Sequence, residues 1–332
     1  MKNTFLFKQG VYIAAASSVA GPKEAAGPLG RDFDKTYPSI QSAGKSWEET
    51  EIKMQQDALD LLLLKSQRKA SSVEVLLGGD LINQLTITNF ATKERDIPFL
   101  GLYNACATMA EGMLLAASLI GGGFLTNGVV VASSHNAASE RQYRYPNELG
   151  VQREEYSQCT VTAAGAMLLS KEPSPLRILS GTVGTIVDYG VKDPSDMGAA
   201  MAPAAFRTIR EHLRNSNRSI EDYDLICTGD LGLHGHRILT ELMKEEYRFD
   251  EEILQDSGMW IYKKNQDVFC GGSGAGCSAA VWSAYVLPAL KAGKYRRVLL
   301  LGTGALHSPV SVGQGNSIPA IAHGLELIRE EG

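Results

Sequence analysis

The sequence predicts an α/β protein built from two similar halves. Unbroken apolar segments of strand length alternate with segments of helical periodicity, a pattern typical of mostly parallel sheets covered by helices on both faces. The same order of elements occurs twice. In each half a cysteine, Cys106 or Cys277, stands among small residues at the point where a helix is expected to begin. We therefore expect an N-terminal half over residues 1–172 and a C-terminal half over residues 173–332.

The first half begins with a strand at Val11–Ala16 and a loop rich in glycine, proline and alanine. A helix is expected over Trp47–Lys65, because apolar side chains recur there at helical spacing. Between Glu140 and Glu155 the composition is that of a charged, aromatic loop. Strands are also expected at Val73–Asp80 and Pro98–Leu102, and a helix after Cys106 at Ala107–Ile120. A buried strand that ends at a histidine, Gly128–His135, and a last strand, Thr160–Ser170, complete this half.

The second half repeats this order. Nearly the same number of residues separates Cys106 from His135 as separates Cys277 from His307, which supports a duplication. The interval from Asp230 to Cys277 is longer than the corresponding interval of the first half, from Asp80 to Cys106, so the second half carries an insertion. The expected helices are Ala199–Leu213, Ser278–Lys291 and, in the insertion, Gly235–Tyr247; the expected strands are Tyr223–Thr228 and Arg297–His307.

Charge and cysteine content exclude several classes of protein. The net charge of -5, with no basic run, argues against nucleic acid as a partner. The 5 cysteines are odd in number and lack CxxC spacing, so we expect reduced thiols rather than disulfides or a zinc site. No segment reaches the roughly 18 apolar residues of a membrane span. Any membrane association would then be peripheral or through a partner.

Cys106 has two interpretations. It stands among small residues where an apolar run ends and a helix begins. A thiol at a helix N-terminus lies near the positive end of the helix dipole, which favours the thiolate and makes a nucleophile. Most free cysteines, however, are small buried apolar residues. The segment alone leaves both open.

The duplicated halves, the cysteine that opens a helix and the glycine-rich turn of the second half together resemble the thiolase fold of thiolases and ketoacyl synthases. The resemblance implies five layers, αβαβα, with two mixed sheets around a buried helix layer. It also implies a homodimer and, at Cys106, the position of an acylated nucleophile. Two departures count against catalysis: Gly229–Ile238 contains histidines but no His-Gln-Ala-Asn run, and Gly271–Gly274 replaces an asparagine-bearing turn.

A second set of motifs is spread over the chain: Ala20–Glu24 with Gly27–Gly30, Gly79–Gln84, Arg144–Glu148, Gly302–Leu306, Ile318–Pro319 and Ile321–His323. Within that superfamily, these motifs resemble the stage V sporulation protein AD family of spore-forming bacteria. That resemblance implies binding of dipicolinic acid (pyridine-2,6-dicarboxylate), alone or as its Ca²⁺ chelate. It further implies uptake of this solute into the developing spore and release on germination, beside membrane proteins of the same stage V sporulation A group at the spore inner membrane.

Dipicolinate is small, planar and dianionic, so its site needs cationic or N–H donors at two ends of a flat apolar slot. The open ends of strands in both halves supply candidates. Asp80 and Asp230 are either turn caps or, less favoured, calcium ligands. We expect no resident metal or cofactor beyond Ca²⁺ carried with the ligand. The candidate ligand-binding residues are Cys106, Ala107, Asn104, His135, Arg144, His234, His236 and His307.

Three functions from different classes remain open. The first is a non-catalytic solute-binding component of dipicolinate transport, which we favour. The second is an acyl-condensing or thiolytic enzyme with Cys106 as its nucleophile. The third is a scaffold with a vestigial pocket, whose surface docks membrane partners.

Overall fold

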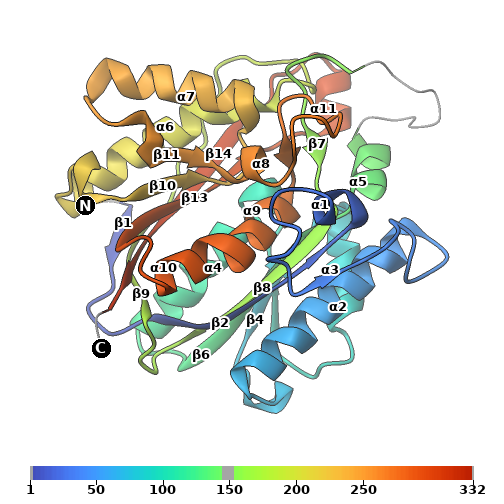
Figure 1. The fold of residues 1–332 in the computed structure, drawn as a ribbon, viewed down its shortest axis with the longest axis vertical. Coiled ribbons are helices and arrows are strands. Elements are labelled where there is room, and N and C mark those ends of the chain that lie inside the picture. The colour runs from blue at the N-terminus through green and yellow to red at the C-terminus, as the bar shows by residue number, and fades with distance from the viewer. Residues whose placement is uncertain (1–2, 144–152, 331–332) are drawn as a thin grey trace.

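The computed structural model describes residues 3–143 and 153–330 (Figure 1). Its strands are β1 Thr4–Leu6, β2 Tyr12–Ala20, β3 Lys35–Thr36, β4 Leu76–Gly79, β5 Phe99–Gly101, β6 Asn127–Ser134, β7 Cys159–Thr160, β8 Ala163–Ser170, β9 Leu176–Thr182, β10 Leu225–Thr228, β11 Leu254–Asp256, β12 Gly272–Ser273, β13 Arg297–Ala305 and β14 Ala320–Arg329. Its α-helices are α1 Pro22–Ala25, α2 Trp47–Ser66, α3 Thr86–Thr92, α4 Thr108–Gly121, α5 Asn136–Tyr143, α6 Met197–Ser216, α7 Gly232–Glu246, α8 Ser257–Trp260, α9 Ala275–Val281, α10 Leu287–Lys291 and α11 Pro309–Gly313.

The two halves of the chain have the same sheet topology. In the first, β5, β4 and β6 are parallel, and β8 and β2 continue the sheet antiparallel; in the second, β11, β10 and β13 are parallel, and β14 and β9 follow antiparallel. This repeated order is the structural form of the duplication that the sequence indicates. The boundary at residue 172 stays a prediction, although it falls between β8 and β9.

The two mixed sheets are joined at one point. Strands β2 and β9 share one registered pair, Tyr12 with Arg177, so the hydrogen-bonded path runs from β11 in one sheet to β5 in the other, with only β1 and β3 of the 12-stranded sheet off this path. The N-terminal strand β1 reinforces the joint, because it pairs antiparallel with β9 of the other half, from Thr4 opposite Thr182 to Leu6 opposite Ser180. The two predicted sheets are thus separate layers with one shared edge.

Helices form three layers around these sheets. Figure 1 shows α6 and α7 over the upper sheet, α2 and α3 under the lower one, and α4, α9 and α10 between the two. The five-layer αβαβα arrangement is therefore confirmed. Among the described residues, no helix has the length and apolar character needed to cross a membrane.

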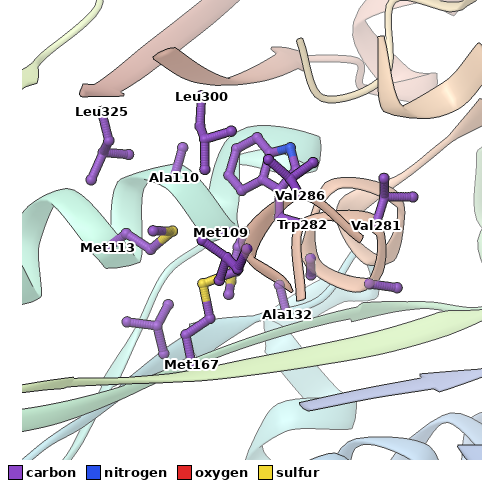
Figure 2. Packing of buried hydrophobic residues seen from close by; sticks show 14 of the residues in the cluster. Met109, Ala110, Met113, Ala132, Met167, Val281, Trp282, Val286, Leu300 and Leu325 are labelled. Atoms are coloured by element: carbon purple, nitrogen blue, oxygen red, sulfur yellow. The ribbon is translucent and has the colours of Figure 1, made fainter. Parts of the chain in front are cut away.

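The middle helices are apolar on nearly all sides because both faces meet a sheet. Figure 2 shows Met109 and Met113 of α4 with Trp282, between Leu300 above and Met167 below. All five side chains are fully buried. Burial of such side chains stabilises the fold by about 1.5–3 kcal/mol each. The α4 segment has few polar residues for this reason.

Several elements differ from their predicted form. Asn136–Tyr143 is the helix α5, whereas the sequence analysis assigns Glu140 and the residues after it to a loop. Strands β9 and β14, which complete the second sheet, are not among the predicted elements. The helix predicted over Ser278–Lys291 begins at Ala275 and contains one π-helical turn, Trp282–Val286. The other predicted helices and strands are present with ends shifted by a few residues.

Candidate functional site

A pocket of about 320 Å³ lies where the strand ends of both halves meet, and Cys106 is part of its wall. Its volume falls in the usual range for small-molecule sites, about 300–1,000 Å³. Most of its described lining side chains are apolar or uncharged polar groups. The lining residues are Leu81, Asn83, Tyr103, Ala105, Cys106, Ser139, Glu140, Tyr143, Thr160, Met197, Ser273, Gly274, Ala305, Leu306, His307, Ser308 and Pro309.

The backbone turns sharply before Cys106. Strand β5 ends at Gly101, and Ala105 adopts the left-handed conformation, with φ of 49°. A 3-10 turn over Ala105–Ala107 then leads directly into α4. A left-handed conformation at a residue other than glycine costs free energy and is typical of functional turns. The turn places the Cys106 side chain against the pocket while leaving it only 6% exposed.

Asp230 lies directly behind the thiol. Its Oδ2 accepts hydrogen bonds from Ser273 Oγ at 3.0 Å and from the Gly274 N–H at 2.9 Å. Its Oδ1 accepts from Thr303 Oγ1 at 2.8 Å, and the Cys106 thiol also donates to this carboxylate. The donors at the start of α9 are therefore occupied by the protein's own carboxylate. A bound carbonyl oxygen would have to compete with it for them.

This arrangement keeps the Cys106 thiol neutral. Burial raises its pKa well above the ordinary value, and the negative charge of Asp230 raises it further; the donors at Gly274 and Ser273 oppose this shift without reversing it. Burial also raises the pKa of Asp230, to about 6, so this carboxyl is largely ionised at pH 7. Because the thiolate is the nucleophilic form, the environment disfavours covalent chemistry at Cys106.

Two rings lie together beside the thiol. The centroids of Tyr143 and His307 are 5.4 Å apart, with an interplanar angle of 41°. Tyr143 donates its hydroxyl to the Leu81 carbonyl at 2.7 Å, which fixes its ring. Near them, the buried hydroxyl of Ser139 has no hydrogen-bond partner among the described residues. The site thus offers planar apolar surface next to a donor that is available to a ligand.

Glu140 gives the pocket a negative charge. It is buried, accepts a hydrogen bond from Thr160 Oγ1 at 3.0 Å and lies 3.8 Å from the Arg153 guanidinium. Among the described residues, no lysine or arginine lines this pocket. The charge of a dianionic ligand would therefore meet a carboxylate here unless a cation came with it.

Asn104 supports the turn without lining the pocket. Its side-chain amide lies 3.0 Å from His323 Nε2, and His323 Nδ1 accepts the Gly184 N–H at 3.1 Å. The side chain of Asn104 also forms a hydrogen bond with the Glu111 carboxylate. Burial lowers the pKa of His323 to about 4, so the ring is neutral. His323 belongs to one of the family motifs, but it is not among the predicted site residues.

The structure brings Cys106 and His307 to the pocket and leaves the other predicted histidines elsewhere. His135 is buried and its Nε2 contacts the Ile40 carbonyl at 2.7 Å. His234 pairs with Asp196, and His236 contacts the Leu254 carbonyl at 3.0 Å. Ala107 is buried behind Cys106, and Arg144 lies outside the described residues. The expectation that the strand ends gather these histidines at one mouth is therefore corrected.

Asp80 has a structural environment. Its Oδ1 accepts the Ile82 N–H at 2.8 Å, and its Oδ2 accepts both the N–H and the hydroxyl of Thr88 at 2.8 and 2.7 Å. These are the contacts of a turn cap, the favoured interpretation. Among the described residues, no three His, Cys, Asp or Glu side chains converge as metal ligands would.

Two mixed sheets around a buried helix layer, with a cysteine at the start of a central helix, define a thiolase-fold protein. Solved structures agree on this fold. The cerulenin-bound form of OleA from Xanthomonas campestris superposes with a TM-score of 0.62 at 15% identity, covering 98% of this chain and 100% of OleA. The acetamide-bound form gives a TM-score of 0.60 at 15% identity, with the same coverage of both chains.

Sequence comparison identifies the family. The model of the family described as stage V sporulation protein AD matches residues 1–328. Stage V sporulation protein AD of Bacillus subtilis (strain 168) is 42% identical over 331 residues, which cover 100% of this chain and 98% of the relative. The chain belongs to the stage V sporulation protein AD family, and the predicted membership is confirmed.

Proposed function

We propose that the protein binds dipicolinic acid, as its Ca²⁺ chelate, in the pocket at Cys106. We further propose that it takes part in the uptake of this solute into the developing spore and its release on germination. The observation that carries the proposal is the buried carboxylate of Asp230 behind the thiol. This carboxylate occupies the donors beside the thiol, and burial together with the charge of Asp230 keeps the thiol neutral, so the pocket is suited to binding rather than to acyl transfer.

The shape and polarity of the pocket support a flat aromatic acid. The Tyr143 and His307 rings offer planar surface, and the Ser139 hydroxyl is a buried donor that a carboxylate oxygen would satisfy. A buried hydroxyl without a partner costs free energy, so a ligand that accepts from it gains affinity.

Charge favours the chelate over the free acid. Free dipicolinate carries two negative charges, whereas its 1:1 complex with Ca²⁺ is neutral. Asp230 behind the thiol would repel the free dianion, and among the described residues no lysine or arginine lines the pocket to offset this repulsion. The Glu140 carboxylate is also a ligand type that Ca²⁺ accepts. Calcium here would belong to the cargo and not to the protein.

Family membership supports a place beside the membrane. We propose that the protein associates peripherally with the spore inner membrane, through membrane proteins of the stage V sporulation A group. No described helix can itself cross a membrane, so any such contact would involve the surface of the chain.

Catalysis with Cys106 as nucleophile is the alternative, and one observation favours it. The cysteine lines a pocket at the start of a central helix, and the similarly folded OleA binds cerulenin. Incubation with acetyl coenzyme A, followed by intact mass measurement, decides between the two. A stable adduct on Cys106, or thioester turnover that Cys106→Ser abolishes, would establish the enzyme.

Titration calorimetry with dipicolinate, with and without Ca²⁺, tests the binding proposal. Isophthalate is the matched control ligand, because it keeps both carboxylates and loses the ring nitrogen that chelates Ca²⁺. We expect one site, tighter with Ca²⁺ present, and binding of isophthalate weaker by at least tenfold. Ser139→Ala should weaken dipicolinate roughly tenfold, the value of one hydrogen bond to a charged group. Equal binding of both acids would refute the proposal.

A further inference from the structure

A second pocket, of about 340 Å³, lies where the two sheets separate. Strand β2 pairs with β9 at Tyr12 alone and with β3 at Val19–Ala20 alone. Between these points its outer edge, at Ala14–Ala16, has no strand beside it among the described residues. The sheet also shifts register between Ile13 and Ala15. An open edge of small residues thus forms one wall of the pocket.

The opposite wall comes from the middle helix layer. Leu287 and Pro288 of α10 line the pocket, and Pro175 and Leu176 close it at the start of β9. Apart from the hydroxyls of Ser174 and Ser283 and two lysines, the side chains of the lining are apolar. Ser174 Oγ is already used, because it donates to the Ile13 carbonyl at 2.7 Å.

Ser283 supplies an unused polar group. It lies in the π-helical turn Trp282–Val286, where the indole of Trp282 packs into the core between the sheets (Figure 2). The side chain of Ser283 is buried, and its hydroxyl has no hydrogen-bond partner among the described residues. Single π-helical turns are frequent at functional sites. Here the turn places a buried donor at the pocket.

Two ammonium groups belong to the same pocket. Lys65 is paired with Asp34, its Nζ lying 2.8 Å from Oδ1, so its charge is largely met. Lys291 is exposed and forms no ion pair with any described residue. The pocket therefore combines an apolar slot, one buried hydroxyl and one lysine that has no ion-pair partner in the described part of the chain. These features suit an anionic head on an apolar body.

We infer that this pocket is a second ligand site, separate from the Cys106 pocket, for a single-chain organic anion such as a medium-chain carboxylate. The carboxylate lies at Lys291 and the chain occupies the slot between β2 and α10. The inference is independent of the dipicolinate proposal, because the two pockets have no lining residue in common.

Calorimetry with decanoate, kept below its micelle concentration, tests the site on the full chain. We expect one decanoate per chain, with affinity reduced at least tenfold in Lys291→Glu, where attraction to the carboxylate becomes repulsion. Lys264→Glu is the matched control, because it removes an equally exposed lysine outside the pocket and should bind as wild type. Leu287→Trp should also block binding by filling the slot.

Competition separates this pocket from the first one. Saturating dipicolinate should not displace decanoate, and Lys291→Glu should bind dipicolinate as wild type does. If Leu287→Trp does not fold, Lys291→Glu carries the test, since its side chain is exposed. Displacement by dipicolinate, equal affinity in Lys291→Glu and wild type, or no binding at millimolar decanoate would each overturn the inference.

Discussion

At the scale of single residues, Asp230 decides what Cys106 can do. A carboxylate that accepts from Ser273, Gly274 and Thr303 is well stabilised, and it faces the thiol as a fixed negative charge. The predicted position of Cys106, where a helix begins, is close to the observed start of α4 at Thr108, whereas Asp230 is predicted only as a cap or a calcium ligand. No local pattern shows that residues 230 and 273 meet behind residue 106, because the contact depends on how the two halves pack.

Removing this charge should make the thiol reactive. In Asp230→Asn the negative charge disappears while an oxygen remains to accept from Gly274, so the pKa of Cys106 should fall. We expect alkylation by iodoacetamide at pH 8 to be at least tenfold faster than in wild type, measured by intact mass over time. Cys106→Ser in the same background identifies the modified thiol. Unchanged alkylation would show that burial alone protects it.

The size of residue 106 should control dipicolinate binding. Cys106→Ser keeps a donor and frees space, so it should bind nearly as well as wild type, and Cys106→Ala should lose at most about 1.5 kcal/mol, the net value of one hydrogen bond. Cys106→Leu should abolish binding by filling the pocket, and overpacking of this kind costs about 1–3 kcal/mol of stability. Thermal unfolding checks that the variant is folded. If Cys106→Leu binds normally, the ligand occupies another place.

At the scale of elements, sequence patterns find the strands that are apolar throughout and miss those with buried charge. The strands β6 and β13 are continuous apolar runs, and their predicted ranges are nearly correct. Strand β14 contains the buried Glu326, which breaks the apolar pattern. Its charge is met by Arg218 at 3.2 Å, by Arg297 and by the Ser180 hydroxyl. These partners come from distant parts of the chain, so their compensation is invisible in the local sequence.

Helix α2 illustrates the same limit with a testable consequence. Its range is predicted well, yet it buries Glu51, which accepts from Ser133 Oγ at 2.7 Å. Burial and the nearby Asp80 raise the pKa of Glu51 well above its ordinary value. A carboxyl with a raised pKa in the folded state binds its proton more tightly there than in the unfolded chain. Its contribution to stability is therefore present below about pH 4.5 and is lost as pH rises through the folded-state pKa.

Glu51→Gln should remove this loss. The quantity to compare is the melting temperature of Glu51→Gln minus that of wild type. We expect this difference to be more positive at pH 8 than at pH 5, measured by calorimetry at fixed ionic strength. Asp60→Asn, which changes a carboxylate that is 60% exposed on the same helix, is the control and should show no such trend. A parallel pH dependence in all three proteins would contradict the assignment.

At the scale of the whole molecule, the β5 edge of the lower sheet has no strand beside it among the described residues. Strand β5 is the last strand of the lower sheet, and Leu100 on it is 49% exposed. On the neighbouring helix α3, Phe90 is 50% exposed. An exposed apolar edge strand favours association, and pairing of two such edges around a two-fold axis would remove both. We expect a homodimer, as the fold resemblance implies.

Light scattering at micromolar concentration tests this expectation. The mass should be twice the 35.8 kDa of the chain. Leu100→Arg, which places a charge on the edge, should yield a folded monomer, whereas Leu64→Arg, at a residue 74% exposed on α2, should leave the dimer intact. If the wild-type protein is a monomer, the β5 edge is not a dimer interface.

The pairing of β1 with β9 has a consequence for the order in which the chain can fold. Thr4–Leu6 leave the ribosome long before Gly181 and Thr182, their partners in the other half. During synthesis this strand has no edge to join, and the lower sheet can form without it. Closing such a long interval costs chain entropy late in folding. Strand β1 is therefore expected to be added to the fold late, although it is synthesised before its partner strand.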